Sequence, residues 1–302
     1  MRPWQGTSQV AGFSDYSAQN WLRYITGAVP VPSLPSVFLA LFTTPPTGDS
    51  GVGAAEPSGN GYARLQIAGT LVTSDVTAPG NNVLNFGSAV PSWIKQGMTV
   101  RDVSSPAVLP LTLVQVVGSS TVTLQGNAIG AGVGAGDTIS FSAFGEPTAS
   151  VGVEPFTTPA QVVTSLTVTF PTPSGSWGTI SAWGCYDALS GGNLLDWDWL
   201  GAFTWQPFTC VAGSPGTLTS AAHGLSNGDK IAVSTKYGGN LPTTSGSWAG
   251  VLTVANATAD TFTAGVNTTG TGDGAFRKIS QISPFTNLVV SVLSGQLTLT
   301  TA

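Results

Sequence analysis

Glycine and proline decide what this chain can fold into. Its 302 residues include 39 glycines and 20 prolines, spread along the whole length. Proline ends helices and glycine weakens them, so there is little room for long helices. Between these residues the apolar pattern is that of strands: residues 166–170 alternate apolar and polar, and residues 37–42 form an apolar run closed by prolines. The sequence therefore predicts an all-β protein.

One segment near the N-terminus is the exception. Residues 14–26 carry four apolar residues at the i, i+3, i+4 and i+7 spacing of one helical face, which are Ala18, Trp21, Leu22 and Ile25. Ser14 is suited to cap the start, and Gly27 is suited to end the helix. A helix of about three turns is marginal alone, so we expect this face to dock on the rest of the protein.

Two internal segments predict separate modules. Residues 82–144 and 208–277 each contain a Gly-Asp-x-Ile step followed or preceded by a threonine-rich alternating strand. We interpret them as two inserted small β-barrels or sandwiches. The remaining pieces are then an N-terminal arm, residues 1–11, and a discontinuous antiparallel β-sandwich core made of residues 12–81, 145–207 and 278–302.

Charge is scarce, and this excludes several partners. Charged residues make up 8% of the chain, whereas about 25% is usual. Nine basic residues cannot form the stripe that a nucleic-acid binder needs. No apolar run approaches the ~18 residues of a membrane span, and the first residues lack the apolar core of a secretory signal. We expect assembly in the cytoplasm, with much of the surface covered by sister subunits.

The residues that carry chemistry are few. The one histidine, His223, precedes Ser226 and Asp229 in a turn-rich segment, and we interpret it as a turn residue rather than part of a triad. Cys185 and Cys210 are expected to be reduced and buried, with a single bridge between them left open. One histidine and two distant cysteines do not make a metal site. The sequence predicts no enzyme, no metal and no cofactor.

The richest aromatic and acidic stretch lies at residues 196–205. In a strand, Asp196 and Asp198 would share one face, and Trp197 and Trp199 the other, with Trp205 close by in the sequence. Such a group can fill a core, form a subunit interface or bind a glycan; hydrolysis of a glycan would need two carboxylates roughly 5–10 Å apart. We treat these five residues as a candidate glycan or interface patch.

Four motifs outside the two modules carry a family resemblance. They are ALFT at residues 40–43, SGNGYAR at 58–64, FPTPSGSWG at 170–178 and DALSGGNLL at 187–195. In this order, with the helix before them and a hairpin after them, they resemble a family of tailed-bacteriophage virion proteins of the tail-fibre type. The resemblance covers about half of the chain, and the two modules are departures from the short family pattern.

The resemblance implies structural rather than catalytic motif residues. Arg64 is expected to pair with Asp187, or else to be a solvated strand arginine; both interpretations stay open. Gly191 and Gly192 suit a turn that needs positive φ. The full set of structural motif residues comprises Trp21, Tyr62, Arg64, Trp177, Gly178, Trp183, Asp187, Gly191, Gly192 and Asn193.

The expected function follows from the resemblance and the composition together. We expect a non-enzymatic structural component of a tailed-bacteriophage virion, assembled as a homo-oligomer, with a trimer favoured, on the tail or neck beside other virion proteins. Two alternatives stay open. One is a capsid decoration protein, as a cement protein or head fibre, and the other is a module that recognises a host receptor by binding a glycan. No nucleic acid and no membrane partner are expected.

Overall fold

The computed structural model describes residues 12–28, 36–48, 50–107, 109, 111–128, 130–145, 161–201, 204–235, 239–293 and 298–300. Its largest sheet has ten antiparallel strands. In sheet order they are β1 (Gly12–Phe13), β12 (Leu194–Trp199), β11 (Ala182–Tyr186), β2 (Val37–Phe42), β3 (Leu65–Val72), β8 (Thr138–Ser142), β5 (Thr99–Asp102), β6 (Thr112–Val117), β7 (Thr121–Leu124) and β4 (Val83–Asn85).

A second antiparallel sheet is built from later residues. Its six strands, in order, are β16 (Leu252–Thr253), β15 (Lys230–Ser234), β18 (Gly272–Ile279), β13 (Gln206–Val211), β14 (Thr217–Thr219) and β17 (Thr261–Thr263). Two short pairs join β10 (Val168–Thr169) to β19 (Ser291–Val292) and β9 (Gln161–Val163) to β20 (Thr298–Thr300). Among the described residues the one helix is α1 (Asp15–Ile25). The prediction of an all-β, sandwich-like protein with an N-terminal helix is confirmed.

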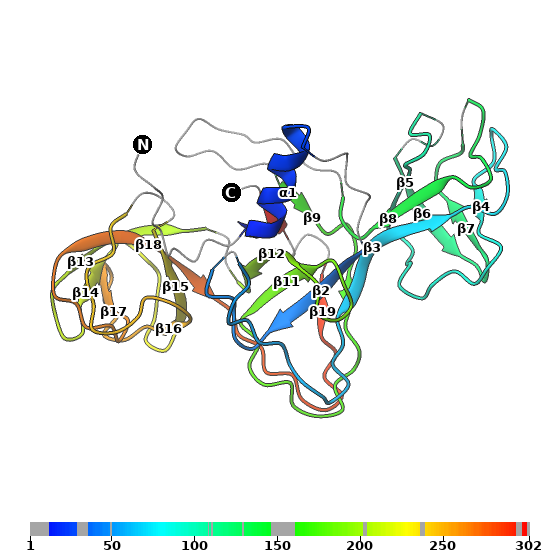
Figure 1. Cartoon of the computed structure of the whole chain (residues 1–302). Coiled ribbons are helices and arrows are strands. Elements are labelled where there is room, and N and C mark those ends of the chain that lie inside the picture. Colours follow the sequence, from blue (N-terminus) through cyan, green and yellow to red (C-terminus); the bar gives the residue numbers. More distant parts are fainter. Residues whose placement is uncertain are drawn as a thin grey trace.

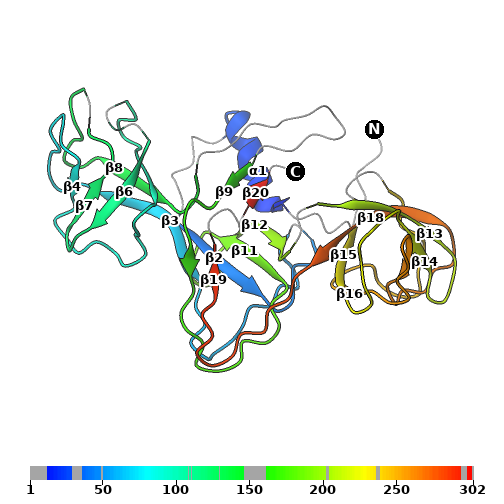
Figure 2. The ribbon, with the colours of Figure 1, turned by 180° about the vertical axis from the view of Figure 1, so that it is seen from behind.

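Three groups of strands lie in a row (Figure 1). The central group contains β2, β11 and β12, the strands β4 to β8 extend to one side, and β13 to β18 form a rounded lobe on the other; the view from behind shows the same order (Figure 2). We call the last group the β13–β18 lobe. Strand β3 joins the first two groups, because its residues 65–68 pair with β2 and its residues 68–72 pair with β8. The division of the chain into a core and two inserted modules stays a prediction.

The buried side chains follow this arrangement. One cluster runs from the central strands into the neighbouring group and includes Leu39, Trp183, Val100 and Phe141. The β13–β18 lobe has a cluster of its own, with Phe208, Phe262 and Phe276 among its members. A third cluster lies where this lobe meets the central strands, and it combines residues of both: Phe42, Trp197, Trp199, Ala232 and Ile279.

The helix is fixed at its start and not along its apolar face. The backbone N–H of Ser14 donates to the Leu195 carbonyl at 3.0 Å, its hydroxyl donates to the Leu194 carbonyl, and its Oγ accepts from the Ser17 N–H at 3.2 Å. No residue of α1 is buried, and Trp21, Leu22 and Ile25 are 57%, 57% and 59% exposed. The expected boundaries and cap are confirmed, but the expectation that this face docks on the same chain is wrong.

The two cysteines are placed as the sequence predicts. Cys185 on β11 and Cys210 on β13 are free and buried. Burial, with a smaller contribution from Asp196, raises the pKa of the Cys185 thiol well above its usual value. Within the part of the chain that the structure describes, no helix has the length and apolar character to cross a membrane.

Gly184, at the middle of β11, is required by close packing. A Cβ at this position would lie 2.7 Å from Cε2 of Phe42 and 3.0 Å from Cδ1 of Leu194. We expect Gly184→Ala to lower the free energy of unfolding by about 1–3 kcal/mol, because the buried rings must shift to make room. Urea unfolding measures the change. The matched control is Gly270→Ala, where a Cβ meets no atom within 4 Å; an equal loss in both variants would contradict the packing argument.

Asp102, at the end of β5, should make the free energy of unfolding depend on pH. Its side chain is 1% exposed, and its Oδ1 accepts from the Ser105 N–H at 2.8 Å. Burial, and then the negative charge of Asp137, raise the pKa of the Asp102 carboxyl above its usual value. Since the folded state holds this proton more tightly than the unfolded state, the contribution of Asp102 is present at low pH and is lost as the pH rises through the raised pKa.

We therefore expect Asp102→Asn to stabilise the protein more at pH 7 than at pH 4, because the amide keeps an acceptor for Ser105 and carries no charge at either pH. Urea unfolding of both proteins between pH 4 and 7 measures the difference. A difference that does not change with pH would contradict the raised pKa.

Candidate functional site

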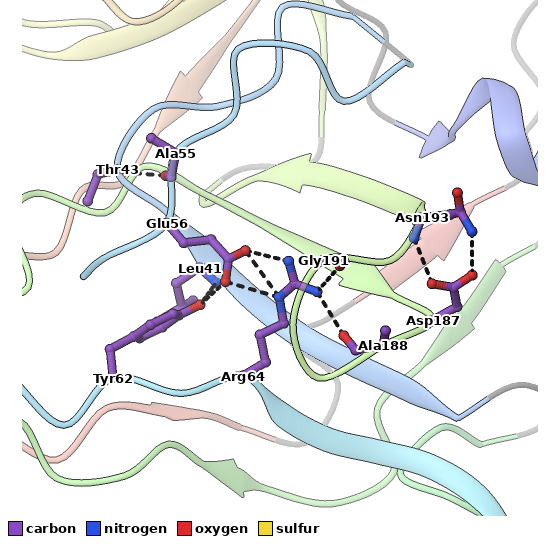
Figure 3. A network of polar contacts seen from close by, with 10 residues as sticks. All are labelled: Leu41, Thr43, Ala55, Glu56, Tyr62, Arg64, Asp187, Ala188, Gly191 and Asn193. Atoms are coloured by element: carbon purple, nitrogen blue, oxygen red, sulfur yellow. Dashed lines mark hydrogen bonds and ion pairs between the residues drawn. The ribbon is translucent and has the colours of Figure 1, made fainter. Parts of the chain in front are cut away.

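Arg64 lies at the centre of a polar network beside the ten-stranded sheet (Figure 3). Its side chain is 8% exposed and forms an ion pair with Glu56, with 2.6 Å between Nη2 and Oε1. Its Nε donates to both oxygens of Glu56, at 3.1 and 3.2 Å. Its Nη1 donates to the carbonyls of Ala188 and Gly191, each at 2.7 Å. The guanidinium also covers the ring of Tyr186, with Cζ 3.5 Å from the ring centroid. One arginine therefore joins three segments of the chain.

Both interpretations of Arg64 are wrong, because it does not pair with Asp187 and its side chain, 8% exposed, is not solvated. Asp187 instead accepts from the backbone N–H of Asn193 at 2.6 Å and from Nδ2 of the same residue at 2.7 Å. These two bonds close the loop of residues 187–193, whose carbonyls Arg64 then binds. The closed loop needs glycine, because Gly191 and Gly192 have φ of 59° and 74°.

The true partner, Glu56, is missed by sequence reasoning although it lies within the EPSGNGYAR stretch. The only signal for it is that this stretch holds a single acidic residue. An acid eight residues before an arginine has no periodic relation to it in a loop, so spacing alone does not select it. The structure selects it, because the loop folds back and brings Glu56 over β2 (Figure 3).

Tyr62 connects this network to the aromatic core. Its hydroxyl accepts from the backbone N–H of Leu41 at 3.0 Å and donates to Oε2 of Glu56 at 2.9 Å. Its ring packs against Trp177 and Phe170, with centroids 5.2 and 6.4 Å apart. Burial is the main reason why the pKa of Tyr62 lies far above its usual value of 10, so the hydroxyl stays a donor at every physiological pH.

The other motif residues pack around the same region. Trp177 is buried and donates from Nε1 to the Asn60 carbonyl at 3.0 Å. Trp183 is buried in the core cluster on β11. Gly178 has a φ of 80°, and a Cβ there would lie 3.3 Å from Cγ2 of Thr43. Trp21 alone lies apart from the others, on the exposed side of α1. We call the group of Glu56, Tyr62, Arg64, Asp187 and Asn193 the Arg64 network.

The candidate glycan or interface patch does not form a surface on this chain. Trp197 and Trp199 are 0% and 1% exposed, and their ring centroids lie 5.7 Å apart within the third cluster. Asp196 is also buried. Strand β12 is covered on both faces. The acidic face and the aromatic face that the sequence predicts are therefore both packed against other parts of the chain. A sugar has no access to these rings, which corrects the glycan interpretation of the patch.

Asp198 and Trp205 instead meet Arg277 of the β13–β18 lobe. The guanidinium of Arg277 is 2.6 Å from Oδ1 of Asp198, and its Nη1 donates to Oδ2 at 3.1 Å. Its Nη2 donates to the Trp199 carbonyl at 2.9 Å, and Cζ lies 5.4 Å from the ring centroid of Trp205. Arg277 is 2% exposed. The patch is therefore an interface between two parts of one chain, and no local pattern of residues points to Arg277 as its partner.

His223 has a structural environment. Its Nδ1 accepts from the Leu225 N–H at 2.9 Å, so Nε2 carries the proton and faces the Thr261 carbonyl at 3.3 Å. Its ring packs on Phe262, with centroids 5.0 Å apart. Both ring nitrogens thus bind the backbone, as expected for a turn histidine. Within the described ranges, no group of three or more histidine, cysteine or acidic side chains is placed to hold a metal ion.

Comparison with known proteins finds one family. The family described as "Podophage GP4 fiber I protein gp80" matches residues 12–105 and 146–206, which together are just over half of the chain. The match includes α1, the whole Arg64 network and Asp198, and it ends at residue 206, the first residue of β13. No curated protein matches the chain.

Proposed function

The chain belongs to the podophage fiber I protein family, and on this premise we propose that it is a non-enzymatic subunit of a fibre on the phage tail, assembled as a homo-oligomer. A trimer is the favoured state, and other virion proteins hold it on the particle. The family match carries this proposal, because it covers the parts of the chain in which α1 and the Arg64 network lie. A fibre protein needs no catalytic group, and both arginine networks are used internally to hold strands and loops.

The scarcity of charge supports assembly. The chain of 302 residues contains nine basic and fourteen acidic residues. Several of them form internal ion pairs, such as Arg64–Glu56 and Arg277–Asp198, and so are not available for contacts with other subunits. Large apolar side chains are exposed in every group of strands, for example Val116, Leu189 and Val211. Subunits with this surface associate through apolar and backbone contacts rather than through charge.

Labelling of the particle tests the location. We propose a tag on the C-terminus of the full chain, detected by gold or antibody on purified virions in electron microscopy. Label at the tail is the expected result. Label spread over the capsid would overturn the tail assignment in favour of capsid decoration, and absence of the chain from purified virions would overturn the structural role itself.

The salt dependence of the oligomer tests which kind of contact holds the subunits together. We expect the purified oligomer to keep its mass between about 0.05 and 1 M NaCl, because screening weakens contacts between exposed charges and leaves apolar contacts intact. Light scattering coupled to size exclusion measures the mass. Dissociation by salt alone would contradict an interface built from uncharged surface.

A further inference from the structure

The two groups of strands beside the central strands are arranged in the same order. Figures 1 and 2 show strands β4 to β8 on one side of the central group and the β13–β18 lobe on the other. Going round from neighbour to neighbour, the strands follow the order β3, β8, β5, β6, β7, β4 in the first group and β13, β18, β15, β16, β17, β14 in the lobe. Numbered from one to six along the chain, both groups therefore follow the order one, six, three, four, five, two.

Each group is closed into a ring by one contact outside its sheet ladders. In the first group, the backbone N–H of Ser74, shortly after β3, donates to the carbonyl of Asn85 on β4 at 2.8 Å. In the lobe, Ala255, shortly after β16, and Thr263 on β17 exchange backbone bonds of 2.9 and 2.8 Å. A closed sheet is a barrel, which protects its strand edges by pairing them. We call the first group the β3–β8 barrel.

The third and fourth strands of the two rings meet through the same hydrogen bonds. Gly97, before β5, donates its N–H to the Val114 carbonyl at 2.8 Å, and Gly228, before β15, donates to the Val254 carbonyl at 2.8 Å. Each valine in turn donates its N–H to the carbonyl of the residue after that glycine, at 2.8 and 2.9 Å. The two glycines have φ of 87° and 93°, a conformation that favours glycine. Strands β5 and β15 thus begin at equivalent positions.

The second and fifth strands also share their register. Leu84 pairs with Val122 in the β3–β8 barrel, and Leu218 pairs with Phe262 in the lobe. All four side chains are 0% exposed, so both pairs lie in a core. Two residues after each leucine, the backbone N–H donates to the carbonyl of the residue two positions before its partner, at 3.0 and 2.9 Å.

The fourth and fifth strands form hairpins of equal length. Residues 112–124 contain β6 and β7, and residues 252–264 contain β16 and β17. The two segments align without a gap in the register just described. In each turn the residue at the seventh position donates its N–H to the carbonyl of the tenth, at 2.8 Å in both hairpins. Only the third, tenth and twelfth positions hold the same residue type, so the sequence shows little of this agreement.

A shared register is stronger evidence of one plan than a shared strand order. A slip of one residue moves every side chain of a strand to the opposite face, so a register is specified by the core that it builds. Three junctions of the ring agree here to the residue. The family match leaves out residues 106–145 and ends at residue 206, so half of the β3–β8 barrel and nearly all of the lobe lie outside it.

We propose that the chain contains two copies of one barrel module, one on each side of the central strands, and that equivalent segments of the copies can replace one another. The copies differ in how they are attached. The β3–β8 barrel is joined through β3, which pairs with both β2 and β8, whereas the lobe is fastened to β12 by Arg277.

Exchange of the hairpins in the full chain tests the equivalence. In one chimera, residues 252–264 replace residues 112–124. The larger phenylalanine that replaces Val122 is partly offset by the smaller alanine that replaces Leu124, and a second version keeps both original residues to remove any misfit of core volume. Hydrogen exchange followed by mass spectrometry should remain slow in β4 and β5, the strands that pair with this hairpin.

The matched control shifts the transplanted segment by one residue. Residues 253–265 in the same place keep the length but turn the buried side chains outward, so slow exchange in β4 and β5 should be lost. The reciprocal chimera puts residues 112–124 in place of residues 252–264, with residues 113–125 as its shifted control. Its exchange is measured in β14 and β15, which pair with the lobe hairpin. The barrel left unchanged in each chimera is the internal reference.

Slow exchange in an in-register chimera, with fast exchange in its shifted control, is the expected result in either barrel. In-register chimeras that exchange as fast as their shifted controls in both barrels would overturn the proposal. Shifted controls that exchange as slowly as the in-register chimeras would also overturn it, because register would then not matter. These measurements use the purified chain, so the position of the tagged chain on the particle tests the proposed function separately.

Discussion

Replacing Arg277 with methionine should unfold the junction between the β13–β18 lobe and the central strands. The variant leaves the carboxylate of Asp198 without the bidentate guanidinium, and the Trp199 carbonyl without its donor. Removal of one partner from a buried ion pair costs about 3–5 kcal/mol, because the remaining charge stays out of water. We expect a loss of this size in urea unfolding, with faster proteolysis near residues 200–206.

The neighbouring residue provides the control. Lys278 pairs with Asp229 at 2.8 Å, but its side chain is 52% exposed, so Lys278→Met should change stability by less than about 1 kcal/mol. The double variant Asp198→Leu/Arg277→Met should recover most of the loss, since both charges are then gone. If Arg277→Met were no more harmful than Lys278→Met, the junction would not depend on this ion pair.

Replacing Arg64 with lysine should have the second-largest effect, although the charge is kept. Lysine cannot bind both oxygens of Glu56 and at the same time reach the carbonyls of Ala188 and Gly191, nor can it cover the Tyr186 ring with a planar group. We expect a loss of about 3 kcal/mol in the free energy of unfolding, because buried acceptors lose their donors.

Hydrogen exchange and a matched variant test the predicted effect of Arg64→Lys. Hydrogen exchange should be fastest in the loop of residues 187–193, which Arg64 fastens to the rest of the sheet. Arg23→Lys, the same change on the exposed helix, should stay within about 0.5 kcal/mol of the wild type. Full stability in Arg64→Lys would mean that charge alone, rather than the guanidinium geometry, holds the network.

The two arginine networks join parts of the molecule that are far apart in the sequence. Arg64 fastens the loops at one end of the central sheet, and Arg277 fastens the β13–β18 lobe to β12. The third cluster, which contains Ala232 and Ile279 beside Trp197 and Trp199, adds apolar contact at the same junction. The β13–β18 lobe is therefore joined to the central strands by buried ionic and apolar contacts.

The sequence by itself determined the features that depend only on neighbouring residues, such as helix caps, tight turns and the positions of several strands. Ser14 caps α1, and Gly191 and Gly192 take the positive φ that the 187–193 turn requires. Alternation and apolar runs located strands such as β2 and β11. These features depend on the backbone preferences of a few adjacent residues, so they can be predicted without knowing the fold.

Only the tertiary structure decided which distant groups meet. Arg64 pairs with Glu56 and not with Asp187, Asp198 finds Arg277 at a separation of 79 residues, and the apolar side of α1 faces outward. Each outcome depends on which strands are neighbours in a sheet and on where a loop returns. Sheet order is set by the summed packing of the whole chain, and no local pattern of residues contains it.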